Sequence, residues 1–117
     1  MPRPRAFDTD AVVTTATTVF TEYGYNGASM DQLLAATGIR RASLYNAFGS
    51  KRGLFLSALR AAAVPVDLVV VALMDLAPAD PAVRAELAAL LDARGLNAHA
   101  LGEAVLRRAG IEERGQG

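Results

Sequence analysis

Apolar residues recur at spacings of three and four along most of the chain, which is the period of an α-helix. The first such stripe precedes Gly24, a residue that readily takes the left-handed conformation at a helix end. Asp8 or Thr9 can cap the start, because a short side-chain acceptor satisfies the free N–H groups there. A helix over 10–23 is therefore predicted, with one buried face. That face comprises Val12, Val13, Ala16, Val19, Phe20 and Tyr23.

Two short helical patterns follow, and Thr-Gly-Ile at 37–39 separates them. Ser29 and Gln32 match a capping box, in which each side chain bonds the backbone N–H of the other residue, so a helix is predicted over 30–37. Gly38 ends it, Ile39 anchors the turn, and a second helix is predicted over 41–48. A helix, a short turn with glycine and a second helix form a helix-turn-helix unit.

Four further helices are predicted after this unit. Ser50 caps the first, whose stripe is expected to reach Ala62 before Pro65 disrupts or kinks the helix. The segment 66–76 is apolar nearly all round; its β-branched residues would also suit a strand, but the helical context favours a buried helix. Asp80 and Asn97 cap the last two helices. Their inward positions are Val83, Leu87, Leu90 and Leu91 in one, and Leu101, Val105 and Leu106 in the other. The fold class is therefore all-α.

Composition excludes several kinds of site. The 117 residues contain no cysteine, so disulfides, thiolate metal sites and cysteine nucleophiles are absent. No signal peptide is visible, and the longest apolar run, 68–74, is far too short to cross a bilayer. A cytoplasmic location is expected.

A net charge of zero hides an asymmetry between the two halves of the chain. Residues 1–60 hold seven basic and four acidic residues, whereas 61–117 hold five basic and eight acidic ones. This division indicates that only the first half meets a polyanion.

The predicted helix over 41–48 has an outer side suited to DNA. At about 100° per residue, Leu44 and Phe48 fall together on the inner side. The second helix of a helix-turn-helix unit enters the major groove, so the outer residues are candidates for base contacts. They are Arg40 and Arg41 at the helix start, followed by Ala42, Ser43, Tyr45 and Asn46.

Each of these residue types suits a contact with a duplex. Arginine can bond guanine through two N–H groups, and asparagine can bond adenine. The Tyr45 hydroxyl can reach a phosphate, and Ala42 permits close approach. Ser29 and Lys51 lie at helix starts, where free N–H groups favour an anion. Taken singly, Ser29 and Ser50 are ordinary caps and Tyr45 a half-buried ring; the joint arrangement around one short helix points to DNA.

Two other classes of function compete with DNA binding. A small helical dimerisation or adaptor protein would explain the apolar 66–76 segment, but not the outward polar residues beside four basic ones. An enzyme has little support, because His99 has only Glu103, four residues later, as a carboxylate on a shared helix face. No Gly-x-Ser-x-Gly or P-loop pattern is present, so the protein is predicted not to be an enzyme.

The stretch FTEYGYNGASMDQLLAATGIRRASLYNAFGSKRGLF resembles the DNA-binding domain of the TetR family of bacterial transcriptional repressors. The resemblance covers roughly residues 8–60 and departs from the family pattern at Ala42, where glycine is frequent. It is carried by Phe20, Tyr23-Gly24-Tyr25, Ser29, Gly38-Ile39, Leu44-Tyr45, Phe48, Ser50-Lys51 and Leu54 or Phe55.

The resemblance implies a repressor that binds a palindromic operator as a homodimer and is therefore expected at the nucleoid. A small-molecule inducer would release it from the DNA. No cofactor or metal is expected. Residues 1–7 are expected to form a flexible arm, 8–60 the helix-turn-helix domain, and 61–117 a helical dimerisation or ligand domain, shortened or truncated relative to the family. In the resemblance, Ser29, Tyr45 and Lys51 hold phosphates. Arg40, Arg41, Ala42, Ser43 and Asn46 lie at or near base edges.

Overall fold

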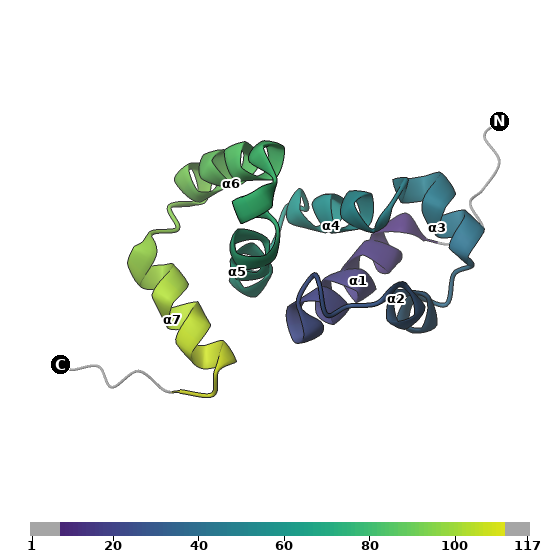
Figure 1. Ribbon diagram of the computed structural model, residues 1–117, viewed down its shortest axis with the longest axis horizontal. Coiled ribbons are helices and arrows are strands. Elements are labelled where there is room, and N and C mark those ends of the chain that lie inside the picture. Colours follow the sequence, from purple (N-terminus) through teal and green to yellow (C-terminus); the bar gives the residue numbers. More distant parts are fainter. Residues whose placement is uncertain (1–7, 112–117) are drawn as a thin grey trace. The chain divides into compact units, whose positions relative to one another are not determined.

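The computed structural model describes residues 8–111, and every secondary-structure element in that range is a helix (Figure 1). The predicted arm at 1–7 and most of the polar C-terminal tail lie outside the described residues. The chain divides into two compact units between Val64 and Pro65. The first unit contains α1 (Thr9–Tyr23), α2 (Met30–Thr37), α3 (Arg41–Phe48) and α4 (Lys51–Leu59). The second contains α5 (Val66–Asp75), a short 3₁₀ helix η1 (Ala77–Ala79), α6 (Pro81–Arg94) and α7 (Ala98–Arg108).

Local capping chemistry sets the helix starts. Asp8 is the cap of α1, because its carboxylate accepts the N–H groups of Asp10 and Ala11 at 3.0 and 3.4 Å. The predicted capping box is confirmed: Gln32 N–H donates to Ser29 Oγ at 3.0 Å, and Ser29 N–H donates to Gln32 Oε1 at 2.8 Å. Both caps satisfy N–H groups that have no partner within the helix.

The first unit packs α2 and α4 against α1, and α3 against α4. Aromatic rings fill its centre: Phe20 and Phe55 meet edge to face with centroids 4.9 Å apart, and the Tyr25 ring lies 5.8 Å from Phe20 and 5.2 Å from Phe55. Leu33 and Leu44 are fully buried, which anchors α2 and α3 to this core. Such edge-to-face and offset contacts are preferred between aromatic rings.

Three details of the first unit and of the boundary after it differ from the prediction. Tyr23 is 50% exposed rather than inward. The turn after α1 approaches its backbone closely, since a Cβ on Gly27 would overlap the Tyr23 carbonyl oxygen. The fourth helix ends at Leu59, well before Pro65, and Ala62 is exposed. Pro65 serves as the N-cap of α5, so it begins a helix and does not kink one.

The second unit is built around α5, which packs against α7, η1 and α6. Its residues from Leu68 to Ala72 are all buried, so the prediction of a buried helix here is confirmed. Asp80 and Asn97 cap α6 and α7 as predicted. The inward placement of Val105 was wrong: Val105 is 43% exposed and Ala104 is buried instead, because the main neighbour of α7 is α5, which covers one narrow face.

No helix within residues 8–111 combines the length and the apolar character needed to span a membrane.

Candidate nucleic-acid interface

The turn between α2 and α3 fixes where the second helix begins. Gly38 adopts φ 75° and ψ 7°, and its N–H closes the end of α2 on the Leu34 carbonyl at 2.9 Å. Glycine is suited to this position because a Cβ is unfavourable in the left-handed region. Two residues later Arg40 is the N-cap of α3, and its side chain makes no capping hydrogen bond.

The two sides of α3 differ sharply in exposure. Leu44 is fully buried, and Ala47 and Phe48 are partly covered. The residues on the opposite side are the ones that the helical period predicts to be outward. Ser43, at the edge of this side, is partly covered. The exposed members of this side are Arg40, Arg41, Ala42, Tyr45 and Asn46. We call this surface the α3 face; its contact with DNA stays a prediction.

Arg41 is joined to α2 by an ion pair that the sequence did not predict. Its Nη2 lies 3.1 Å from Oδ1 of Asp31, and the two side chains are 52% and 91% exposed. Asp31 is in the first turn of α2, where a carboxylate is favoured by the helix dipole. Arg41 therefore enters the α3 face with one of its nitrogens already bonded.

The start of α4 is held close to the end of α3. Ser50 Oγ accepts the Gly53 N–H at 2.9 Å, and a Cβ on Gly53 would overlap the Phe48 carbonyl oxygen. Glycine at 53 thus permits the close approach of the two helices. The Ser50 cap thus satisfies the Gly53 N–H at the start of α4.

Lys51 occupies the first position of α4, and its Nζ lies 4.5 Å from the centroid of the Tyr25 ring. This is a cation–π contact, since the ammonium is within about 6 Å of the ring centre. Tyr25 also packs on Phe20 and Phe55, so the core orients the lysine. The sequence assigned no such part to Tyr25, because the two residues are far apart in the chain and no spacing rule joins them.

Ser29 lies at the start of α2, and its hydroxyl oxygen accepts the Gln32 N–H. The ordinary capping function considered for this serine is therefore present. Its side chain is exposed, and a hydroxyl that accepts through oxygen can still donate its proton. The cap and a phosphate contact are thus compatible at Ser29.

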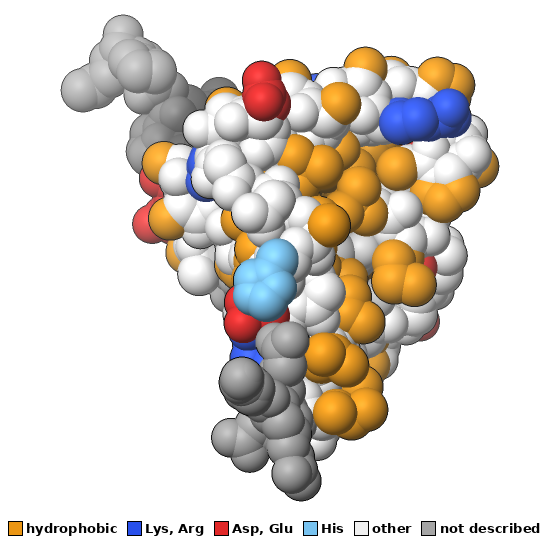
Figure 2. All heavy atoms as spheres, turned by 90° about the vertical axis from the view of Figure 1, so that its left-hand side faces the viewer, with side chains coloured by type: hydrophobic (Ala, Val, Ile, Leu, Met, Phe, Trp, Pro, Cys, Tyr) orange, Lys and Arg blue, Asp and Glu red, His pale blue; other side chains and the backbone are white. Residues whose placement is uncertain are grey.

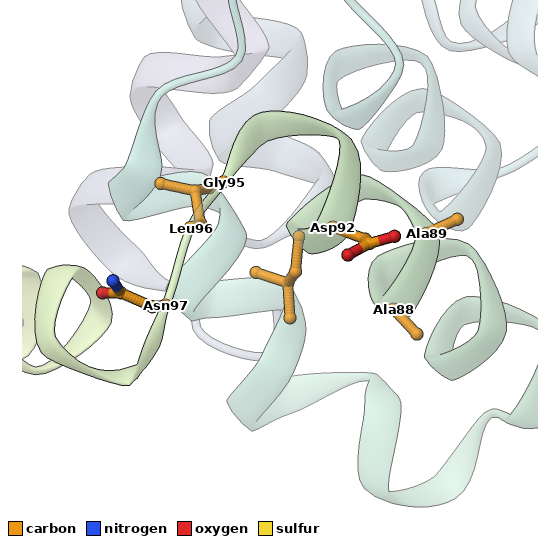
Figure 3. A pocket seen from close by; sticks show the side chains of 7 residues that line it. Ala88, Ala89, Asp92, Gly95, Leu96 and Asn97 are labelled. Atoms are coloured by element: carbon orange, nitrogen blue, oxygen red, sulfur yellow. The ribbon is translucent and has the colours of Figure 1, made fainter.

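The second unit has a different surface chemistry. Figure 2, which faces α6 and α7, shows hydrophobic side chains gathered on the surface, and the unit exposes Met74, Val105 and Ile111 to at least 43%. An open hollow of about 730 Å³ lies at the end of α6 (Figure 3). Its lining comprises Ala88, Ala89, Leu91, Asp92, Gly95, Leu96 and Asn97.

His99 and Glu103 do share a face of α7, with His99 Nε2 lying 3.6 Å from Glu103 Oε2. Both side chains are well exposed, which fits a solvated helix pair. Within residues 8–111 no group of three or more His, Cys, Asp or Glu side chains is placed to hold a metal ion.

Residues 12–58, which include all of α2 and α3, match the family described as bacterial regulatory proteins, tetR family. The chain carries a TetR-family helix-turn-helix domain. The resemblance found in the sequence and the predicted all-α fold class are both confirmed.

Several curated relatives are similar to about half of the chain or less. They include the uncharacterized HTH-type transcriptional regulator YezE of Bacillus subtilis, 52% identical over 60 residues, and the HTH-type transcriptional repressor ComR of Escherichia coli, 40% identical over 57 residues. The alignments cover 51% and 49% of this chain, but 31% and 27% of those proteins. The IcaR regulator of Staphylococcus aureus, named a negative transcriptional regulator of the biofilm operon icaADBC, is 37% identical over 46 residues, which are 39% of this chain and 25% of IcaR.

The chain thus spans less than a third of the length of these curated relatives. No solved structure matches it significantly. The names of the relatives favour a DNA-binding regulator over the adaptor alternative, and they give no support to an enzyme.

Proposed function

We propose that this protein is a sequence-specific transcriptional regulator that represses by binding duplex DNA through the α3 face. The observation that carries the proposal is the outward set Arg40, Arg41, Tyr45 and Asn46 on a short helix whose other side is anchored by buried Leu44. A rigidly anchored helix with exposed donors can lie in the major groove and bond base edges. Repression is proposed because the similar proteins ComR and IcaR are named a transcriptional repressor and a negative transcriptional regulator.

The contacts divide between positioning and recognition. Ser29, Tyr45 and Lys51 are proposed to hold phosphates, which fixes the register of the protein on the duplex without reading its sequence. The residues proposed to lie at or near base edges are Arg40, Arg41, Ala42, Ser43 and Asn46. The operator would lie on the chromosome, so the proposal places the protein at the nucleoid in the cytoplasm.

We further propose that the protein acts as a homodimer on a palindromic operator, because two reading helices one helical turn apart need a two-fold partner. The second unit offers a surface for this association. Met74, Val105 and Ile111 are large apolar side chains that water covers in the single chain. Packing against a second copy would remove that surface from water, which is favourable.

The resemblance also implies a small-molecule inducer, and the hollow at the end of α6 is its proposed place. Ala88, Leu91 and Leu96 supply an apolar lining. Asp92 and Asn97 supply a carboxylate and an amide (Figure 3). This combination suits an apolar molecule with a hydrogen-bond donor such as an amine. Release of bound operator DNA by such a compound would test this part.

The DNA-binding proposal is tested by a salt titration of duplex binding with wild type and Lys51→Ala. If the dimer neutralises about eight phosphates, log K falls with log salt at a slope of roughly −7. Lys51→Ala should weaken binding to all sequences alike and make the slope shallower by about 0.9 for each phosphate that is no longer neutralised.

Arg107→Ala is the matched control, because it removes the same charge from α7 in the second unit. It should leave both the affinity and the slope unchanged. Absence of salt-dependent binding by the wild type, or equal decreases in affinity in the two variants, would refute the proposal.

A further inference from the structure

One negative charge lies directly beside the α3 face. Asp31 is the only acidic residue between Glu22 and Asp67, in a stretch with five basic residues. Its carboxylate bonds Arg41 across the helix-turn-helix turn, from the first turn of α2 to the first turn of α3. A negative charge beside a surface that meets phosphates opposes association, because the potentials of the two surfaces should be complementary.

Stability of the fold does not explain this pair. Both side chains are largely in water, and an exposed ion pair gains little because solvent screens it and two long side chains must be ordered. The helix dipole favours a carboxylate at this position of α2, but that effect requires no bond to Arg41. The ion pair itself therefore calls for a different explanation.

Orientation of the guanidinium provides one. The group is planar and presents five N–H donors in a fixed fork. With Nη2 bonded to Asp31 Oδ1 at 3.1 Å, rotation of the plane is restricted, and Nη1 and Nε keep their donors for another acceptor. A restricted donor loses less conformational entropy when it meets an acceptor at the matching position, and it fits other positions less well.

We propose that Asp31 is a specificity-determining positioning residue that acts through Arg41. The carboxylate aims the guanidinium at one base or phosphate position and lowers its attraction to phosphates elsewhere. Asp31 thus decreases non-specific affinity and increases discrimination between sequences. This inference rests on the proposed function, since it requires that the α3 face binds DNA.

The test compares a selected operator with a shuffled duplex of equal length. The operator is first selected from random duplex DNA with wild-type protein, and both affinities are then measured over a range of salt. Asp31→Asn should bind the shuffled duplex more tightly. The ratio of the two affinities should fall about fivefold or more, which is the lower end of the discrimination from one good base contact. If the released arginine moves to a phosphate, the salt slope becomes steeper by about 0.9 per protomer.

Three further variants separate positioning from net charge. Asp10→Asn makes the same change in the first turn of α1, and it should leave the affinity ratio unchanged. Asp31→Glu keeps the carboxylate and should retain most of the discrimination. In an Arg41→Ala background, Asp31→Asn should have no further effect on the ratio, because its target is gone.

Each other outcome contradicts the proposal. If the ratio is unchanged in Asp31→Asn, or falls equally in Asp10→Asn or in the Arg41→Ala background, Asp31 does not act through Arg41. Those results would leave the proposed function intact, because the wild type would still select an operator. If the wild type enriches no sequence at all, the proposed function and this inference fall together.

Discussion

The outward sides of α3 and α7 differ in chemistry although both helices bury only one narrow side. Next to buried Leu44, α3 exposes Tyr45 and Asn46, which carry hydrogen-bonding groups. Next to buried Ala104, α7 exposes the apolar Val105, although His99, Arg107 and Arg108 are also exposed on this helix. An outward side with hydrogen-bonding groups suits a hydrated, charged partner such as DNA, whereas an exposed apolar side chain such as Val105 suits a second protein surface. This contrast supports the proposals that the first unit recognises DNA and that the second unit forms the homodimer.

The two units also differ in what fills them. All seven aromatic residues precede Leu56, and Phe20, Tyr25 and Phe55 form one packed group in the first unit. The core of the second unit is aliphatic, with the run from Leu68 to Ala72 at its centre. Base contacts need side chains held to a fraction of an ångström, which a well-packed aromatic core can provide.

The largest change in stability or binding is expected from substitution of two adjacent residues of α3, one buried and one exposed. Leu44→Ala should lower the free energy of unfolding by about 2–5 kcal/mol, because it leaves a cavity at a fully buried position. Tyr45→Ala should leave unfolding nearly unchanged and weaken DNA binding. Chemical denaturation and duplex titration of both variants measure this. If Tyr45→Ala destabilised the fold and Leu44→Ala only weakened DNA binding, Tyr45 and not Leu44 would face the core.

Recognition by Asn46 should produce the next largest effect. Asn46→Ala should lose about 1–3 kcal/mol at particular base pairs if its amide bonds a base edge. Competition with duplexes substituted at single positions measures this loss, and Lys51→Ala serves as the comparison because its loss should be uniform. A uniform loss from Asn46→Ala as well would refute base reading by this residue.

Association through the second unit should respond to a charge on α7. Val105→Glu should raise the dissociation constant of the homodimer at least tenfold, about 1.4 kcal/mol, because an unpaired carboxylate would be buried on association. Sedimentation velocity measures the effect. Arg107→Glu, a substitution on the same helix at another exposed position, is the control. If wild type and Val105→Glu had the same dissociation constant, α7 would not be part of the proposed dimer interface.

Most of the fold was predictable because the helix boundaries depend on local chemistry. The Ser29–Gln32 capping box and the left-handed Gly38 define α2, and the same logic applies to Asp80 before Pro81. The exposures of Tyr23 and Val105 were not predictable in this way. Periodicity gives the direction of a buried face, but the width of that face depends on which neighbours cover it, and those neighbours are set by tertiary packing.

The sequence predicted which residues of α3 are exposed, but it did not predict the contacts that these and neighbouring side chains make with one another. The exposed set on α3 follows from the helical period, since Leu44 fixes the inner side. The pairs Asp31–Arg41 and Tyr25–Lys51 join different elements, and no sequence spacing specifies them. The end of α4 at Leu59 was also missed, because the alanines after it are compatible with a longer helix.

Selection from random duplex DNA tests whether the α3 face reads DNA sequence. Wild-type protein is mixed with the random pool at moderate salt, and the bound fraction is amplified and sequenced over several rounds. We expect enrichment of one short half-site in two inverted copies, with about one helical turn between their centres. A bound fraction as random as the starting pool would contradict this expectation.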